Sequence, residues 1–208
     1  MPRQMADPAF RAVQTAGAFT AAHVAPINTF VDRLRDRDGR GWAPYVPPHH
    51  GGVDARVVSI LRDPGPATQL GVGSGFLSTE NDDPTAERMA RLFDRFGIAS
   101  RVVLPWNAYP WYINAAPNAA QSRAGAVALL ELLELTPDIE AVLLQGRDAQ
   151  RAWQRACVMD PNLRSRYSVH ATIHPGRQAL FHPDPEERRR RIADQEHTFE
   201  LIAAELTV

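Results

Sequence analysis

The sequence ARVVSIL occupies residues 55–61 and runs directly into RDPGP at residues 62–66. The first segment is mostly apolar and β-branched and is too short for an ordinary helix, so it predicts a buried strand. Two prolines and a glycine prevent a strand or helix from continuing through the second segment. Asp63 therefore stands at the carboxyl end of a core strand, where open α/β sheets bind their ligands.

Downstream of this strand, short apolar runs alternate with helical patterns. Further strands are expected at residues 101–104, 141–144 and 168–173, and helices at 83–97, 118–135, 148–157 and from 184 onward. In the helix over 83–97, Asp83 can cap the start, Pro84 suits the first position and Gly97 suits the end. Alternating strands and helices imply a parallel sheet covered on both faces. We therefore expect an α/β fold with three α/β/α layers around a four-stranded parallel sheet.

Residues 1–50 predict an N-terminal helical extension that packs on the domain formed by residues 51–208. An alanine-rich helix is expected over residues 6–24, Pro26 interrupts it, and a helix can resume over residues 27–34. Two aromatic residues and three prolines within residues 42–48 indicate an ordered connector. Near the other end of the chain, DPEE at residues 184–187 predicts a capping box at the start of the last helix.

The composition restricts the classes of protein and site. A chain of 208 residues with 44% hydrophobic residues can bury a sizeable core without cross-links. The one cysteine, Cys157, excludes an internal disulfide, a four-cysteine iron–sulfur cluster and a zinc ribbon. No apolar run suits a membrane span or a signal peptide, and the net charge of −1 leaves no global basic footprint for nucleic acid. We expect a cytoplasmic monomer that uses no metal and no other cofactor.

Polar side chains follow three of the predicted strands. Asp63 follows the first strand, Asn107 follows the second and His174 follows the fourth. The carboxyl ends of parallel strands meet at one edge of a sheet, so these three side chains should face one crevice. A carboxylate, a carboxamide and an imidazole that converge there form a candidate active site.

Five short motifs follow one another along the chain. They are LRDPG at 61–65, GSGFLS at 73–78, LPWNA at 104–108, LLQGRDAQ at 143–150 and HPG at 174–176. On these motifs the chain resembles the uracil-DNA glycosylase superfamily over about residues 52–205. Each motif is short, but five of them in this order at compatible spacing favour membership of that superfamily.

The resemblance implies a DNA glycosylase of base excision repair, which hydrolyses the N-glycosidic bond of a base flipped out of DNA. Asp63 would stabilise the positive charge on the sugar and orient a water, and His174 would donate a hydrogen bond to the base. Phe76 would stack on the base, and Asn107 would bind its polar edge. The other residues that the resemblance assigns are Arg62 and Gly65 at the base, and Ser78, Arg177 and Gln178 at the DNA.

The chain departs from the most uracil-selective members of this superfamily at two places. Those members carry a tyrosine two residues after the catalytic aspartate, where it blocks a 5-methyl group, whereas this chain has Gly65. A roomier pocket is implied, so the expected substrate is uracil or a related damaged base. In the family, the side chain that intercalates into DNA follows the histidine motif, and here Arg177, Gln178 and Leu180 are the candidates.

Other interpretations stay open. A weak or inactive superfamily member that binds DNA lesions or a free base would carry the same motifs, and a different small-molecule hydrolase can share the scaffold. Asp63 can be only a turn residue, and His174 only a buried structural histidine. Phe76 can be plain core, and Asn107 can simply satisfy backbone groups. The four arginines at 188–191 favour a solvated helix face over a phosphate contact, and the spacing of the histidines does not support a metal site.

Overall fold

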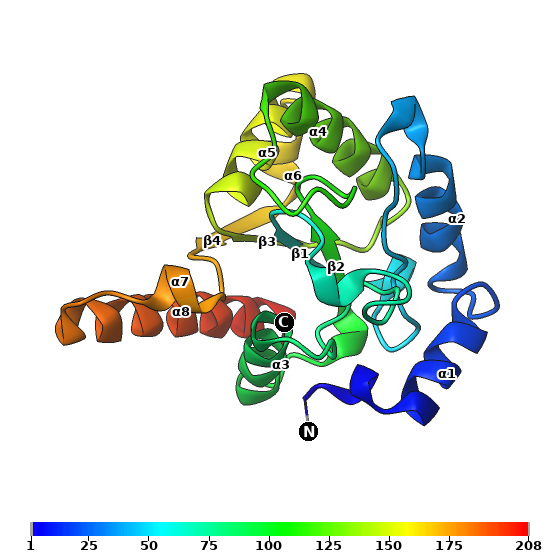
Figure 1. Cartoon of the computed structure of the whole chain (residues 1–208). Coiled ribbons are helices and arrows are strands. Elements are labelled where there is room, and N and C mark those ends of the chain that lie inside the picture. Colours follow the sequence, from blue (N-terminus) through cyan, green and yellow to red (C-terminus); the bar gives the residue numbers. More distant parts are fainter. Residues whose placement is uncertain (1, 208) are drawn as a thin grey trace.

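The computed structural model, which describes residues 2–207, contains a sheet of four parallel strands (Figure 1). The strands are β1 (Val57–Leu61), β2 (Val103–Asn107), β3 (Ala141–Gln145) and β4 (Ser168–Thr172), in the spatial order β2-β1-β3-β4. The expected α/β class and parallel sheet are confirmed. β2 lies later in the chain than predicted, because residues 100–102 form a 3-10 turn before it.

The four strands end together at one edge of the sheet. Leu61 of β1 lies beside Asn107 of β2, and Gln145 of β3 lies beside Thr172 of β4. Residues that follow these strand ends therefore start from the same edge, as expected for a ligand site in an open parallel sheet.

Helices cover both faces of the sheet, which gives three layers. One face packs against α2 (Ala25–Leu34), α4 (Ala119–Glu134) and α5 (Arg147–Met159), and the other against α3 (Pro84–Arg95) and α8 (Pro185–Leu206). Figure 1 shows α4 and α5 on one side of the sheet and α3 and α8 on the other. Strand side chains alternate between the two cores, so Ile60 and Trp106 lie in the first while Val57 and Val103 lie in the second.

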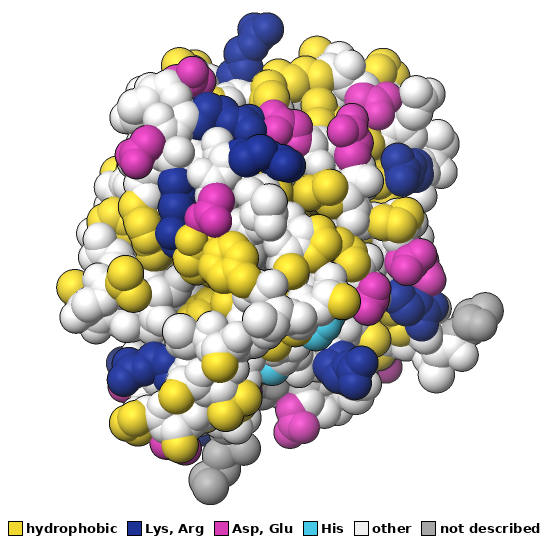
Figure 2. All heavy atoms as spheres, turned by 90° about the vertical axis from the view of Figure 1, so that its right-hand side faces the viewer, with side chains coloured by type: hydrophobic (Ala, Val, Ile, Leu, Met, Phe, Trp, Pro, Cys, Tyr) yellow, Lys and Arg dark blue, Asp and Glu magenta, His cyan; other side chains and the backbone are white. Residues whose placement is uncertain are grey.

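The N-terminal segment shares the first of these cores. α1 (Pro8–Gly17) is shorter than predicted, and Pro26 does not interrupt a helix but lies in the first turn of α2. Proline is tolerated there because the first N–H groups of a helix have no intrahelical acceptor. Phe30 of α2 is fully buried and stacks on Trp106, with ring centroids 6.0 Å apart. Figure 2 shows acidic and basic side chains interspersed on the face that carries these helices, so that face is not uniformly basic.

Side-chain caps define the starts of the main helices. The Asp83 carboxylate accepts hydrogen bonds from the backbone N–H groups of residues 85 and 86, which confirms the predicted start of α3. At α8, Asp184 accepts from the Glu186 N–H as expected, but the reciprocal half of the predicted capping box is not formed. Glu187 instead pairs with Arg190 and Arg191 on the next turn, and its pKa is lowered to about 2 by Arg190 first and then Arg191.

The remaining elements are short. They are α6 (Leu163–Arg166), α7 (Arg177–Leu180) and 3-10 turns at Gln4–Ala6, Arg37–Gly39, Gly52–Asp54, Pro66–Thr68 and Ser100–Val102. None of the helices within residues 2–207 combines the length and the apolar character that crossing a bilayer requires.

A pair of histidines, half-buried His49 and fully buried His50, joins the N-terminal segment to the loop that precedes α3. The ring centroids of His49 and His50 are 4.1 Å apart. His49 Nε2 lies 3.2 Å from Ser78 Oγ, and the Thr79 N–H donates to His50 Nε2 over 3.3 Å. Burial lowers the pKa of His49 to about 4, and burial followed by the neighbouring His49 lowers the pKa of His50 well below 6.5. Both imidazoles are therefore neutral at pH 7.

Acidification is expected to destabilise the fold through this pair. Unfolded histidine takes up its proton near pH 6.5, whereas folded His49 does so only near pH 4, so the unfolded state binds more protons between these values. The free energy of unfolding should fall by roughly 3 kcal/mol over that interval from His49 alone. Urea unfolding at stepwise lower pH measures the fall. His49→Gln should make it shallower, and an unchanged fall in this variant would assign the effect to other groups.

Candidate active site

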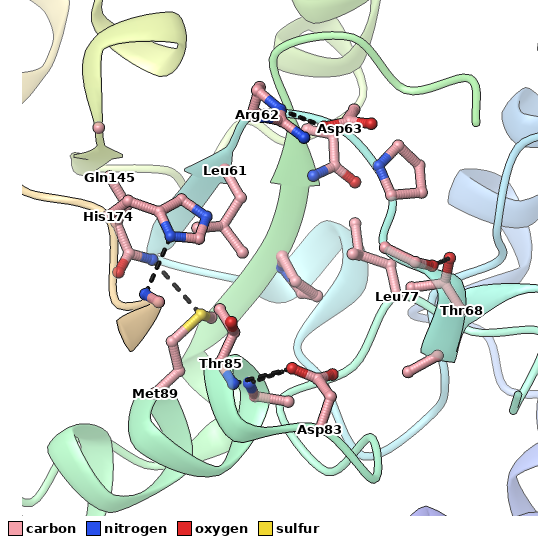
Figure 3. A pocket seen from close by; sticks show the side chains of 18 of the residues that line it. Leu61, Arg62, Asp63, Thr68, Leu77, Asp83, Thr85, Met89, Gln145 and His174 are labelled. Atoms are coloured by element: carbon pink, nitrogen blue, oxygen red, sulfur yellow. Dashed lines mark hydrogen bonds and ion pairs between the residues drawn. The ribbon is translucent and has the colours of Figure 1, made fainter. Parts of the chain in front are cut away.

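A pocket of about 550 Å³ opens at the carboxyl edge of the sheet (Figure 3). Its walls come from the ends of β1, β2 and β3, the start of α3 and the loop between β4 and α7. A volume of this size lies within the range of small-molecule sites in proteins. The three strand-end residues Asp63, Asn107 and His174 all line this pocket.

The Asp63 carboxylate lies on the pocket wall with one oxygen bonded and one oxygen free. Its side chain is only 3% exposed, and Arg62 Nε donates to Asp63 Oδ1 over 2.5 Å. The second oxygen, Oδ2, is buried and has no hydrogen-bond partner within residues 2–207. Asp63 therefore offers the pocket a hydrogen-bond acceptor that the neighbouring guanidinium holds in place.

The Asn107 carboxamide is the least satisfied polar group of the pocket. The residue is 1% exposed, and neither its oxygen nor its nitrogen has a partner in the described part of the chain. An unsatisfied buried polar group costs roughly 1–3 kcal/mol, so such a group in a pocket indicates a ligand. Asn107 makes no side-chain bond to the described backbone, so the structure does not support its interpretation as a backbone partner. Its amide offers one acceptor and two donor hydrogens to a planar polar edge.

His174 is held in one tautomer. The Gly176 N–H donates to His174 Nδ1 over 2.9 Å, which leaves Nε2 to carry the proton of the neutral ring. Burial lowers the pKa of His174, Arg62 lowers it further, and the carboxylates of Asp63, Asp148 and Asp83 partly oppose this. At neutral pH the imidazole is thus an uncharged hydrogen-bond donor through Nε2. In Figure 3 its ring faces the wall that carries Thr68 and Leu77.

The other residues that the resemblance assigns to the base or the DNA, except Phe76, also line the pocket. Arg62 and Gly65 line the pocket, and a Cβ atom at Gly65 would meet nothing within 4 Å. Arg177 and Gln178 line it from α7 and are exposed. Ser78 also lines the pocket, but its hydroxyl already accepts from the Glu80 N–H and contacts His49.

The structure does not bring Phe76 to the pocket. Phe76 is buried in a separate cluster with Met5 and Ala18, and the next residue, Leu77, lines the pocket instead. Phe76 pairs with Tyr45 in an isolated bridge, in which the Tyr45 N–H donates to the Gly75 carbonyl oxygen and the Leu77 N–H donates to the Tyr45 carbonyl oxygen. The neighbouring side chains of Phe76 and Leu77 therefore point to opposite sides. The interpretation of Phe76 as a core residue is confirmed, and the apolar wall of the pocket at this place is Leu77.

Two polar residues to which the sequence analysis assigns no role also support the pocket. Gln145 at the end of β3 is buried and donates through Nε2 to Ser59 Oγ over 2.9 Å. Gln195 of α8 is fully buried and donates to the carbonyl oxygen of Ile173, next to His174, over 3.2 Å. The sequence carries a signal for Gln195, because it lies four residues before the buried Phe199 on the same helix face.

We expect Gln195→Leu to loosen His174. Arg88 Nε donates to Gln195 Oε1 over 2.8 Å, so this variant leaves both Arg88 and the Ile173 carbonyl unpaired and should destabilise the fold by roughly 1–3 kcal/mol. A nitrogen-detected NMR titration of His174 should show a less pure Nε2–H tautomer and a smaller downward shift of its pKa. Gln154→Leu, at an exposed position of α5, is the matched control. A normal His174 titration in Gln195→Leu would show that Gln195 only stabilises the fold.

Two arginines of the run at 188–191 are engaged with α8 itself and with the segment before it. Arg190 and Arg191 bond to Glu187, and Arg191 also donates to the carbonyl oxygens of Ala179 and Phe181. These contacts agree with the solvated-face interpretation of the run.

No known family model matches this sequence, and no curated protein matches it.

Proposed function

We propose that the protein is a DNA glycosylase of the uracil-DNA glycosylase superfamily that releases uracil or a related damaged base from DNA. The observation that carries this proposal is the meeting of Asp63, Asn107 and His174 in one pocket with their reactive atoms free. The five sequence motifs support the same class. We further propose that it acts on DNA as a monomer in the cytoplasm.

The free Asn107 carboxamide fits recognition of a base that has left the helix. Extruding a base costs a few kcal/mol of stacking and pairing, which contacts in the pocket must offset. The Asn107 amide can donate to a base carbonyl and accept from a ring N–H, and both atoms are unpaired before binding. Leu77 supplies an apolar surface at the same pocket. Hydrogen bonds to the edge of a base would satisfy the two unpaired amide atoms of Asn107, and removing the cost of leaving them unpaired would favour binding.

Asp63 and His174 fit the two charges that form as the glycosidic bond breaks. The electron pair of the C1′–N bond moves onto the base, and the sugar becomes positively charged. The free Asp63 oxygen would stabilise the sugar cation and accept a hydrogen bond from the water that adds to C1′. His174 Nε2–H would donate to the base oxygen as negative charge develops there. The water adds its oxygen to C1′ and gives up a proton to solvent, and the departing base anion takes up a proton from solvent, so the products are an abasic site and the neutral free base.

A cleavage assay on end-labelled oligonucleotides tests the proposal. Each oligonucleotide carries one base: uracil opposite guanine, uracil in a single strand, thymine opposite guanine, hypoxanthine, xanthine or ethenocytosine. Alkali converts each abasic site into a strand break. Breaks that vanish in the double variant Asp63→Asn/His174→Ala would support a glycosylase and identify its base. Binding of these oligonucleotides by folded protein without any cleavage would contradict it and favour a lesion-binding protein.

Gly65→Tyr is expected to narrow the substrate range towards uracil. The space around Gly65 is open, and its φ of −82° suits any residue, so a tyrosine ring can enter the pocket without backbone strain. Exclusion of one methyl group should raise the ratio of uracil to thymine release by roughly tenfold or more. Gly65→Ala, whose Cβ meets nothing, should leave the ratio unchanged. An unchanged ratio in Gly65→Tyr would place the 5-position of the base elsewhere in the pocket.

A further inference from the structure

Arg62 carries a positive charge that its partner Asp63 uses only in part. Arg62 Nε donates to Asp63 Oδ1, and the two terminal nitrogens of Arg62, Nη1 and Nη2, donate to no residue within 2–207. Arginine and carboxylate side chains often pair through two parallel hydrogen bonds, whereas this pair uses one. The guanidinium has five N–H groups and stays protonated in proteins, so four of its donors and its charge are available to a ligand.

The Arg62 guanidinium borders the pocket. Arg62 lines the pocket and its side chain is 40% exposed, so a ligand can reach the free N–H groups. Figure 3 shows Arg62 beside Asp63 at the end of β1. After burial, Arg62 is the strongest cause that lowers the pKa of His174, so its charge reaches the ring that would donate to the base. The guanidinium is therefore within electrostatic reach of the place where a base would bind.

The charge of Arg62 can favour only one of the two groups that separate when the glycosidic bond breaks. The sugar becomes positively charged, and a cation beside it would raise the barrier. The base takes the electron pair and becomes negatively charged, and a cation beside it would lower the barrier. Asp63 already offers a free carboxylate oxygen for the sugar, while His174 meets the base only as an uncharged donor. The base side of the pocket is thus where a free cation can add to catalysis.

We propose that Arg62 is a further catalytic residue, whose free N–H groups donate to a carbonyl oxygen of the base and balance its negative charge as the C1′–N bond breaks. This inference rests on the proposed function, because it needs a base in the pocket. The electron pair of the bond goes to the base, Arg62 keeps its proton, and the base anion takes up a proton from solvent afterwards. A DNA phosphate offers a similar oxygen, but the bond to the buried Asp63 anchors the guanidinium on the pocket wall, which favours the base.

The dependence of the rate on the leaving base tests the inference. Duplexes carry uracil or 5-fluorouracil opposite guanine, and single-turnover release is measured for both. The fluorine withdraws electrons and stabilises the base anion, so 5-fluorouracil needs less help from a cation. Arg62→Gln should lower uracil release by roughly 10²–10³-fold and 5-fluorouracil release by at least about tenfold less. Arg62→Lys keeps the charge and should keep the wild-type ratio of the two rates. Arg155→Gln, at an exposed position of α5 outside the pocket, is the matched control.

Two binding measurements do not depend on cleavage. Free 5-fluorouracil is titrated with base in the presence of protein, and its fluorine NMR signal reports its ionisation. Bound to the wild type, it should ionise at lower pH than when bound to Arg62→Gln, because the cation favours the anion. The second measurement is the affinity for a duplex with an uncleavable tetrahydrofuran analogue of the abasic site. Arg62→Gln should leave this affinity within about twofold, since the analogue has no base for Arg62 to contact.

Three outcomes would overturn the inference. An equal loss of uracil and 5-fluorouracil release in Arg62→Gln would mean that Arg62 acts only through the position of Asp63. Weaker binding of the tetrahydrofuran duplex with a smaller salt dependence would assign Arg62 to a phosphate. Ionisation of 5-fluorouracil at the same pH with wild type and Arg62→Gln would show that the charge does not reach the base. An ionisation shift that depends on Arg62, in a protein that releases no base, would contradict only the glycosylase.

Discussion

Asp63→Asn is expected to lower the rate of base release by roughly 10³-fold and to leave the affinity for lesion-containing DNA within about twofold. The variant keeps the size of the side chain but removes the negative charge that faces the developing sugar cation. In the ground state the sugar carries no such charge, so the loss should fall on the chemical step rather than on binding. Single-turnover cleavage and equilibrium binding to the tetrahydrofuran analogue separate these two effects.

A second carboxylate of the same pocket provides the control for this variant. Asp148 also lines the pocket, but its carboxylate lies 3.5 Å from Arg151 at the start of α5. Asp148→Asn removes an equal charge from the pocket without removing the free oxygen of Asp63. If both variants lower the rate equally, the effect of Asp63→Asn comes from the total negative charge of the pocket and not from the position of the Asp63 carboxylate. If Asp63→Asn loses DNA binding and cleavage together in a folded protein, Asp63 organises the turn and is not catalytic.

The strands could be predicted from the sequence where burial imposes a composition. β1 and β3 lie in the interior of the sheet with helices on both faces, so their residues are almost all apolar. β2 was predicted to end before Pro105, although the strand continues to Asn107. Proline is tolerated there because β2 is an edge strand, whose outer side needs no backbone N–H donor. Sequence patterns do not show which strand lies at an edge.

Some residues of the candidate site could be predicted from the sequence, and others could not, because their positions depend on packing between distant parts of the chain. Asp63, Asn107 and His174 could be placed together because each follows a parallel strand, and such strands end at one edge. The choice between Phe76 and Leu77 could not be made, because Tyr45, far away in the sequence, sets which of the two faces the pocket. Gln195 could not be linked to His174, because their connection runs through a carbonyl oxygen that only the packing of α8 brings near.

The rate of base release is expected to fall on acidification with a midpoint below pH 6.5, and His174 is expected to cause this fall. The lowered pKa of His174 means that the neutral ring dominates at pH 7 and the imidazolium forms only at lower pH. A proton on Nδ1 removes the acceptor of the Gly176 N–H, so the charged ring loses the contact that aims Nε2 into the pocket.

His174→Ala should lower the rate at pH 7 by roughly 10²–10³-fold, the range found when one transition-state donor is lost. The variant should also lack the part of the acid limb that follows the NMR titration of His174 in the wild type. A wild-type acid limb that persists unchanged in His174→Ala would assign it to another group, and a rate near that of the wild type would remove His174 from the mechanism.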